Sequence, residues 1–152
     1  MSTMRVMLLG SGELGRELTL SFQRLGVEVT AVDRYAGAPA HGVADEALVV
    51  KMTDPDELSA VIARVRPACV VANTTAVAVD ALRAAADGGV TEVVPGLLAA
   101  QLSLDREGMR RLAADELGLP TAPFWFAGSE AELEAIATHA GFPLVVKPVT
   151  GA

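Results

Sequence analysis

The sequence predicts an α/β protein in which helices cover both faces of a parallel sheet. Strand and helix patterns alternate through the first two thirds of the chain, which is typical of βαβ units. The expected strands are short and apolar on both faces, as strands are when helices cover a sheet from both sides. A glycine-rich turn at residues 10–15 joins the first expected strand to the first expected helix, as in Rossmann-like folds.

The expected elements of this first part are bounded by local signals. Residues 14–25 carry apolar side chains at helical spacing and stop at Gly26, a natural C-cap. Asp54 is the expected N-cap of the next helix, with Pro55 at the first helical position. We expect strands at residues 5–9, 27–32, 47–50, 69–72 and 92–94, and helices at residues 14–25, 54–65 and 79–86.

From Pro95 onward the alternation of strands and helices gives way to mainly helical patterns. We expect helices at residues 97–102, 107–117 and 130–139, and strands at residues 124–126 and 144–147. The last 34 residues therefore look like the opening of a second domain. The expected organisation is a domain at residues 1–102, a linking helix at residues 103–118, and the truncated start of a further domain at residues 119–152.

Composition excludes several classes of protein. Of the 152 residues, 51% are hydrophobic, which is enough to fill a core. The formal charge of −7 argues against a nucleic-acid partner, because such proteins favour a basic surface. Uncharged stretches such as residues 67–79 are well short of the roughly 20 residues that span a membrane, so we expect a cytoplasmic protein. Cys69 is the only cysteine, which excludes a disulfide framework within one chain.

The glycine loop (residues 10–15) has the spacing Gly10-x-Gly12-x-x-Gly15, and Asp33 ends the next expected strand 18 residues later. This context is typical of phosphate and dinucleotide binding at a helix N-terminus. Alternatively, the glycines only permit close packing of strand and helix. A carboxylate at Glu13 would repel a pyrophosphate, and it suits a ligand that offers hydroxyl or amino groups there. Equally, Glu13 could merely complement the helix dipole.

Asp33 has two interpretations as well. It could hold ribose hydroxyls, or it could end a strand and pair with Arg34. The loop and its acidic residue thus leave open a free-standing NAD(P)-binding Rossmann module. A non-catalytic structural or regulatory domain is a further alternative.

Four segments of the chain carry a resemblance to a known family. They read RVMLLGSGELGRE, QRLGVEVTAVDRYAGAPAHGVAD, DREGMRRLAADELGLPTAPFWFA and GFPLVVKPV, and they occur in this order between Arg5 and Val149. The chain resembles the N-terminal portion of formate-dependent phosphoribosylglycinamide formyltransferases, which belong to the ATP-grasp superfamily. The GSGELG and DRYAxAPA segments are specific to this resemblance, whereas a bare glycine loop would not be.

The resemblance implies a Rossmann-like pre-ATP-grasp domain followed by the start of an ATP-grasp lobe. It also implies an enzyme of purine biosynthesis that uses Mg-ATP to convert formate into formyl phosphate. The amine of glycinamide ribonucleotide then attacks that intermediate. By the same resemblance the enzyme is a homodimer. The implied substrate-binding residues are Gly12, Glu13, Leu14 and Asn73, and the implied ATP-binding residues are Arg106 and Lys147.

Two departures from the family pattern matter. Asn73 falls where the family has a substrate-binding glutamate, so a charge contact to the amine becomes a neutral hydrogen bond. The magnesium-binding glutamates and most contacts to the substrate phosphate lie beyond residue 152 in the family. We therefore expect no metal ligand and no catalytic residue in these 152 residues, and no activity from this chain by itself.

Overall fold

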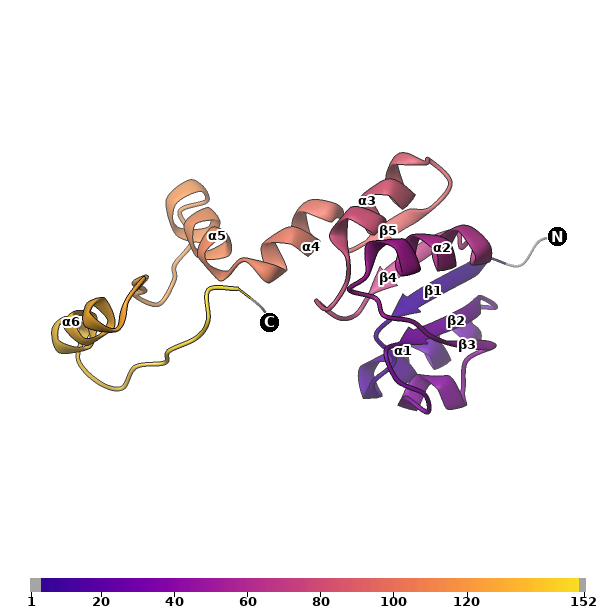
Figure 1. Ribbon diagram of the computed structural model, residues 1–152, viewed down its shortest axis with the longest axis horizontal. Coiled ribbons are helices and arrows are strands. Elements are labelled where there is room, and N and C mark those ends of the chain that lie inside the picture. Colours follow the sequence, from indigo (N-terminus) through magenta and orange to yellow (C-terminus); the bar gives the residue numbers. More distant parts are fainter. Residues whose placement is uncertain (1–3, 151–152) are drawn as a thin grey trace. The chain divides into compact units, whose positions relative to one another are not determined.

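The computed structural model describes residues 4–150. The chain divides into two compact units, Met1–Ala100 and Gln101–Ala152. The first unit contains a five-stranded sheet in the order β3-β2-β1-β4-β5, and each neighbouring pair is parallel. Figure 1 shows these strands, which confirm the predicted fold class. Their bounds are β1 (Arg5–Leu9), β2 (Glu28–Asp33), β3 (Glu46–Val49), β4 (Cys69–Ala72) and β5 (Glu92–Val94).

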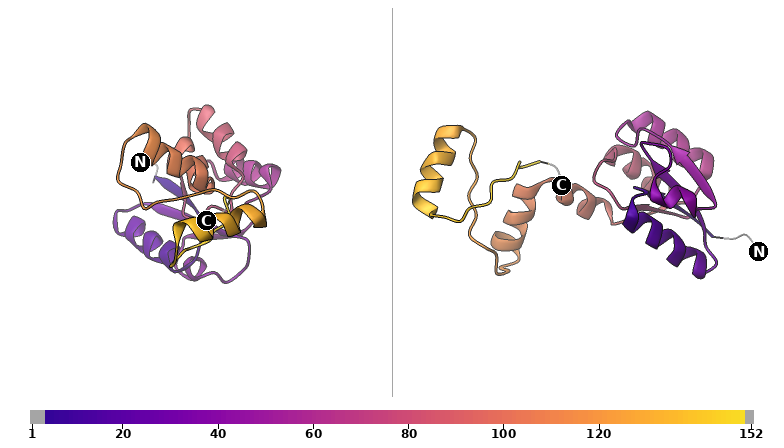
Figure 2. Two further views of the ribbon diagram at one scale, coloured as in Figure 1. Left: turned by 90° about the vertical axis from the view of Figure 1, so that its left-hand side faces the viewer. Right: turned by 90° about the horizontal axis from the view of Figure 1, so that it is seen from below.

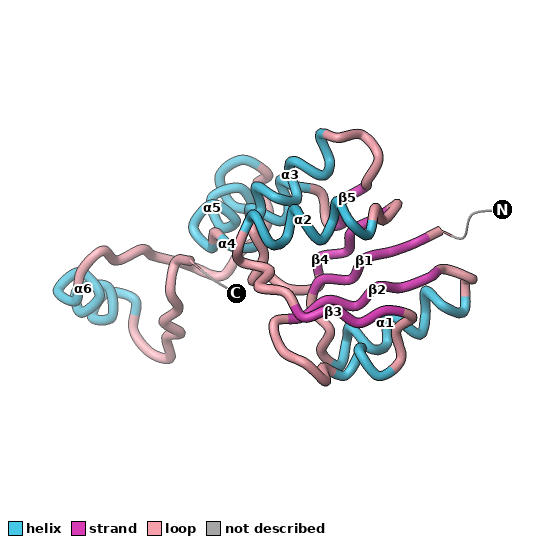
Figure 3. The backbone as a smooth tube through the Cα atoms, turned by 45° about the vertical axis from the view of Figure 1, so that its right-hand side comes forward, coloured by secondary structure: helices cyan, strands magenta, loops and turns pink. Residues whose placement is uncertain are grey.

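Helices cover the two faces of this sheet. α1 (Glu13–Arg24) lies on one face, whereas α2 (Pro55–Val65) and α3 (Val79–Asp87) lie on the other (Figure 3). Successive side chains of β1 point to opposite faces of the sheet, as they do in any pleated strand. Met7 and Leu9 belong to the main core cluster with residues of α2 and α3, and both are fully buried. A short 3-10 helix, η1 (Pro39–Gly42), lies between β2 and β3.

The ends of α2 follow the sequence signals closely. The Asp54 side chain accepts hydrogen bonds from the N–H groups of Asp56 and Glu57, at 3.0 and 3.2 Å. Asp54 is therefore the N-cap that the sequence predicts, because it satisfies two amides of the first turn. The helix ends where Arg66 takes a left-handed conformation with φ +50°.

The apolar stripe that predicts α1 is only partly buried. Leu14 and Leu25, at the ends of that stripe, are 62% and 79% exposed. The fully buried positions are instead Gly15 and Thr19, and Thr19 donates its hydroxyl proton to the Gly15 carbonyl at 2.9 Å. Small residues face the sheet because α1 approaches β1 closely near the glycine loop.

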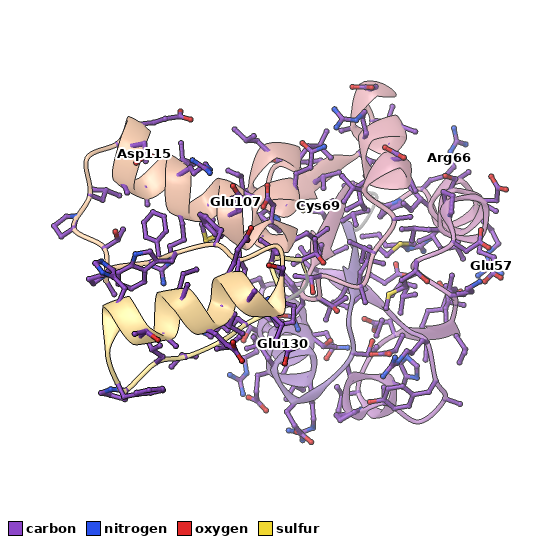
Figure 4. The ribbon with its side chains drawn as sticks, turned by 60° about the vertical axis from the view of Figure 1, so that its left-hand side comes forward. Glu57, Arg66, Cys69, Glu107, Asp115 and Glu130 are labelled. Atoms are coloured by element: carbon purple, nitrogen blue, oxygen red, sulfur yellow. The ribbon has the colours of Figure 1, made fainter. Side chains whose placement is uncertain are left out.

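The second unit is mainly helical. α4 (Leu97–Leu104) leads into it, and α5 (Arg106–Arg111) continues as one π turn at Leu112–Glu116. Further along, α6 (Glu130–Ala140) forms the yellow helix of Figure 2. The Ser129 hydroxyl caps α6 by accepting a hydrogen bond from the N–H of Glu132 at 3.3 Å. Glu107 and Glu130, in the first turns of α5 and α6, are labelled in Figure 4.

The predicted strands at residues 124–126 and 144–147 are wrong. Among the described residues of this unit, the backbone pairing is a single antiparallel bridge between Asp105 and Thr150. Apolar sequence alone does not make a strand, because a strand also needs a partner for its amides and carbonyls. In this structure Phe126 lies 5.5 Å beneath the guanidinium of Arg111 and 5.5 Å from the ring of Phe124.

No helix within residues 4–150 is long and apolar enough to cross a membrane.

Candidate functional site

The glycine loop lies at the point where the strand order of the sheet reverses. From β1 the chain moves through β2 to β3 on one side, and it then returns to place β4 on the other side of β1. The carboxyl ends of β1 and β4 therefore diverge into two loops, the glycine loop and the loop at residues 73–78. In open parallel sheets the crevice at such a switch point is where ligands bind.

At two positions of the loop, neighbouring atoms lie so close to the backbone that only glycine fits. Gly10 has φ +96°, and a side chain there would bring its Cβ to 3.1 Å from the Cβ of Thr74. A Cβ on Gly15 would lie 2.5 Å from the Gly10 carbonyl oxygen. Gly12 is different, because it has open space around it and serves as the N-cap of α1. No side chain within residues 4–150 caps this helix, so the amides of its first turn can meet a ligand.

The structure brings the four predicted substrate residues to this end of the sheet. Glu13 and Leu14 form the first turn of α1, directly after Gly12, and both are exposed. Asn73 reaches the loop from β4, because its N–H donates to the Leu9 carbonyl at 2.8 Å. Its side-chain amide makes a long hydrogen bond of 3.5 Å to the Gly10 carbonyl.

Sequence reasoning missed Ser11 as a structural residue of the site. Ser11 is fully buried, and its hydroxyl donates to the Val32 carbonyl at 3.0 Å. Its own carbonyl accepts a hydrogen bond from the N–H of Ala40 in η1, at 2.9 Å. The sequence signal for this role is weak, because a serine between two glycines also suits an exposed turn.

Asp33 has a role that neither sequence interpretation describes in full. One carboxylate oxygen accepts the N–H of Ser11, and the other accepts the N–H of Arg34, both at 2.7 Å. The Asp33 carboxylate thus bonds to the backbone N–H of Arg34 and not to the Arg34 guanidinium. Asp33 as a residue is 8% exposed, and its carboxylate is directed at the glycine loop.

Arg106 and Lys147, the two residues proposed for ATP, come from parts of the second unit that meet. The backbone N–H of Arg106 donates to the Val149 carbonyl at 2.9 Å, and its guanidinium donates to the Pro148 carbonyl at 3.0 Å. Lys147 precedes Pro148 and is exposed. Asp105 caps α5 by accepting the N–H of Gly108 at 2.9 Å. In the described part of the chain, no group of three or more His, Cys, Asp or Glu side chains could hold a metal ion.

Two side chains outside the loop have shifted pKa values. Hydrogen bonds from the Val29 N–H and from Gln23 hold the pKa of the exposed Asp45 below its ordinary value. Burial, with the charge of the cross-strand neighbour Glu92 as a smaller cause, raises the pKa of the Cys69 thiol. Cys69, labelled in Figure 4, is therefore a poor nucleophile and not a candidate for catalysis.

The fold and the loop together define a Rossmann-like α/β domain with a glycine loop at the switch point of its parallel sheet. Residues 1–102 match the family described as the ribonucleotide synthetase preATP-grasp domain. The chain belongs to this family.

Comparison with individual proteins is more specific. The chain is 57% identical over 148 residues to a formate-dependent phosphoribosylglycinamide formyltransferase of Burkholderia mallei (strain SAVP1), covering 97% of the chain. It spans 37% of the length of that relative. It is 58% identical to the solved glycinamide-RNase-transformylase T from Mycobacterium tuberculosis, with a TM-score of 0.83, covering 97% of this chain and 44% of that one.

A more distant structure shares the fold. A carboxyaminoimidazole ribonucleotide synthase from Aspergillus clavatus, solved as a complex with ATP, has a TM-score of 0.73 at 23% identity. That match covers 93% of this chain and 36% of the other chain.

Proposed function

We propose that the chain is the N-terminal portion of a formate-dependent phosphoribosylglycinamide formyltransferase and that its glycine loop binds glycinamide ribonucleotide. The observation that carries this proposal is the placement of Gly12, Glu13, Leu14 and Asn73 at one switch point, in a chain 57% identical to such enzymes. The parent reaction is then ATP-driven formylation of the substrate amine in purine biosynthesis. The proposal includes a cytoplasmic homodimer that binds neither nucleic acid nor a membrane.

Each loop residue has a role that its chemistry supports. The uncapped N-terminus of α1 offers amide N–H groups to acceptor atoms of the ligand. The exposed Glu13 carboxylate can accept hydrogen bonds from an amine or from hydroxyls, and the exposed Leu14 offers an apolar surface beside it. The Asn73 side chain binds the Gly10 carbonyl through its amide nitrogen, which leaves its oxygen as the acceptor for the substrate amine.

We assign Arg106 and Lys147 to ATP. Their side chains are cationic groups on two segments that hydrogen bonds hold together, and such groups suit a polyphosphate. ATP would supply the phosphoryl group that activates formate. Among residues 4–150, no group of three His, Cys, Asp or Glu side chains could hold the magnesium ion.

The proposed organisation has a pre-ATP-grasp domain at residues 1–102, a linking helix at 103–118 and the start of the ATP-grasp domain at 119–152. The family match at residues 1–102 and the unit boundary after Ala100 support the first division. Since the chain spans 37% of its relatives, we expect no ATPase or formyl-transfer activity from it alone.

Asn73 provides a direct test of the proposed substrate. In an NMR titration, glycinamide ribonucleotide should shift the amide signals of residues 12–15 and of residue 73. Asn73→Glu would replace a neutral acceptor by a charged one, which should tighten binding of the cationic amine about fivefold. The N-formylated product carries no such charge, so its affinity should not rise.

The matched control is Ala63→Glu, which adds the same charge on the exposed side of α2. It should leave both affinities unchanged. If the unmodified chain binds NAD or NADP at micromolar concentration and shows no response to the phosphoribosyl amine, the proposed function is wrong and a dinucleotide-binding module replaces it.

A further inference from the structure

Asp33 holds the base of the glycine loop from the neighbouring strand. It is the last residue of β2, and its backbone carbonyl accepts the N–H of Val50 at 2.9 Å. Its two carboxylate oxygens accept the N–H groups of Ser11 and Arg34, each at 2.7 Å. A buried carboxylate is stable only when such donors compensate the loss of water, and backbone amides supply them here.

The Ser11 amide needs this partner because the chain leaves the sheet at this point. The Gly10 N–H still pairs with the Val32 carbonyl at 2.9 Å, which continues the ladder between β1 and β2. Gly10 then turns the chain with φ +96°, and the next amide, that of Ser11, donates to a side chain of β2. Its acceptor is the Asp33 carboxylate, which makes the hydrogen bond charge-assisted.

The remaining polar groups of Ser11 are held as well, by Val32 and by Ala40 of η1. Three residues from two elements, β2 and η1, therefore fix Ser11, which immediately precedes Gly12, Glu13 and Leu14. A loop fixed before binding loses less conformational entropy when the ligand arrives. The direction of the amides in the first turn of α1 depends on this fixed base.

We infer that Asp33 is a positioning residue, which acts on the ligand through Ser11 and the glycine loop and does not bind ribose hydroxyls itself. In a dinucleotide site the acidic residue at this strand end holds the ribose. Here each of its oxygens accepts an amide N–H of the protein, and these two hydrogen bonds direct the carboxylate at the base of the glycine loop. This inference rests on the proposed function for the identity of the ligand.

The test compares Asp33→Asn with Asp45→Asn in the 152-residue chain. Both aspartates accept a backbone N–H, but Asp45 accepts that of Val29 near the start of β2, away from the loop. Two ligands are titrated into each variant: glycinamide ribonucleotide and its analogue that lacks the ribose hydroxyls. Asp33→Asn should weaken both about tenfold and to the same extent, while Asp45→Asn should leave both unchanged.

A second measurement needs no variant. In the unchanged chain the Ser11 amide proton should keep its chemical shift when the ligand binds, because the Asp33 carboxylate stays on the loop. An upfield shift of that proton, or a loss in Asp33→Asn that disappears with the analogue lacking hydroxyls, would show direct ribose binding and overturn the inference. Unweakened binding by Asp33→Asn overturns it too. Absence of ligand binding to the unchanged chain overturns the proposed function instead.

Discussion

At Gly15 the first helix comes so close to the preceding loop that no side chain fits. A Cβ there would lie 2.5 Å from the Gly10 carbonyl oxygen and 3.5 Å from a methyl group of Leu8. Helix propensity alone favours alanine over glycine by about 1 kcal/mol, whereas overpacking costs about 1–3 kcal/mol. We expect the steric contact to dominate, so Gly15→Ala should lower the free energy of unfolding by about 1–2 kcal/mol, measured by urea denaturation.

Gly12→Ala is the control from the same loop. No atom lies within 4 Å of the position that its Cβ would take, and Gly12 has an ordinary φ of −68°. Its cost should be about 0.5 kcal/mol, which is what alanine costs at an N-cap. A Gly15→Ala protein as stable as the unchanged chain would contradict the tight approach of α1 to the loop.

At the candidate site, the glycine loop could be predicted from the sequence, whereas one of its hydrogen bonds could not. The spacing of Gly10, Gly12 and Gly15 predicts the loop, because a tight turn between strand and helix needs these residues at these places. The bond from Asp33 to Ser11 was not predictable from spacing. An aspartate at a strand end can turn inward or outward, and only the three-dimensional position of the Ser11 amide decides which.

Among the elements, α2 depends on its N-cap to define where it begins. Asp54 satisfies two amides of the first turn, and α2 contributes the buried residues Leu58, Ile62 and Val65 to the core. Asp54→Ala should therefore lower the free energy of unfolding by about 1 kcal/mol. Asp56→Ala removes an exposed acid from the same turn without removing the cap, and it should cost about 0.5 kcal/mol or less. Equal losses from the two variants would exclude capping as the cause.

Helices could be predicted from residues within or beside them, whereas a strand also needs a neighbouring strand to pair with. In α2 and α6 the N-cap residues, Asp54 and Ser129, stand directly before the helix in the sequence. The five strands of the sheet are short apolar runs that pair with neighbouring strands of the first unit. The segments at 124–126 and 144–147 are equally apolar and also follow expected helices, but no neighbouring strand pairs with them among residues 101–150. Whether such a segment becomes a strand depends on a distant partner, which its own residues do not specify.

Over the whole molecule the buried apolar residues gather in the first unit. The main core cluster extends from Met7 to Val93, whereas α5, the π turn after it and α6 contain no buried residue. The second unit leaves large apolar side chains exposed, with Phe142 at 83% and Val145 at 80%. Since burial of apolar surface is the main stabilising contribution, the first unit contains the interactions needed for a stable fold.

This distribution predicts that a chain shortened to residues 1–102 folds by itself. Its core cluster and its sheet are complete within that range, so urea should unfold it in one cooperative transition. Its free energy of unfolding should agree with that of the main transition of the 152-residue chain within about 0.5 kcal/mol. Far-UV circular dichroism measures the unfolding of both chains. The matched control is Leu58→Ala in each chain. It should lower the free energy of unfolding by about 2–5 kcal/mol in both chains, because Leu58 is fully buried. A shortened chain that lacks cooperative unfolding would show that residues 103–152 contribute contacts on which the first unit depends.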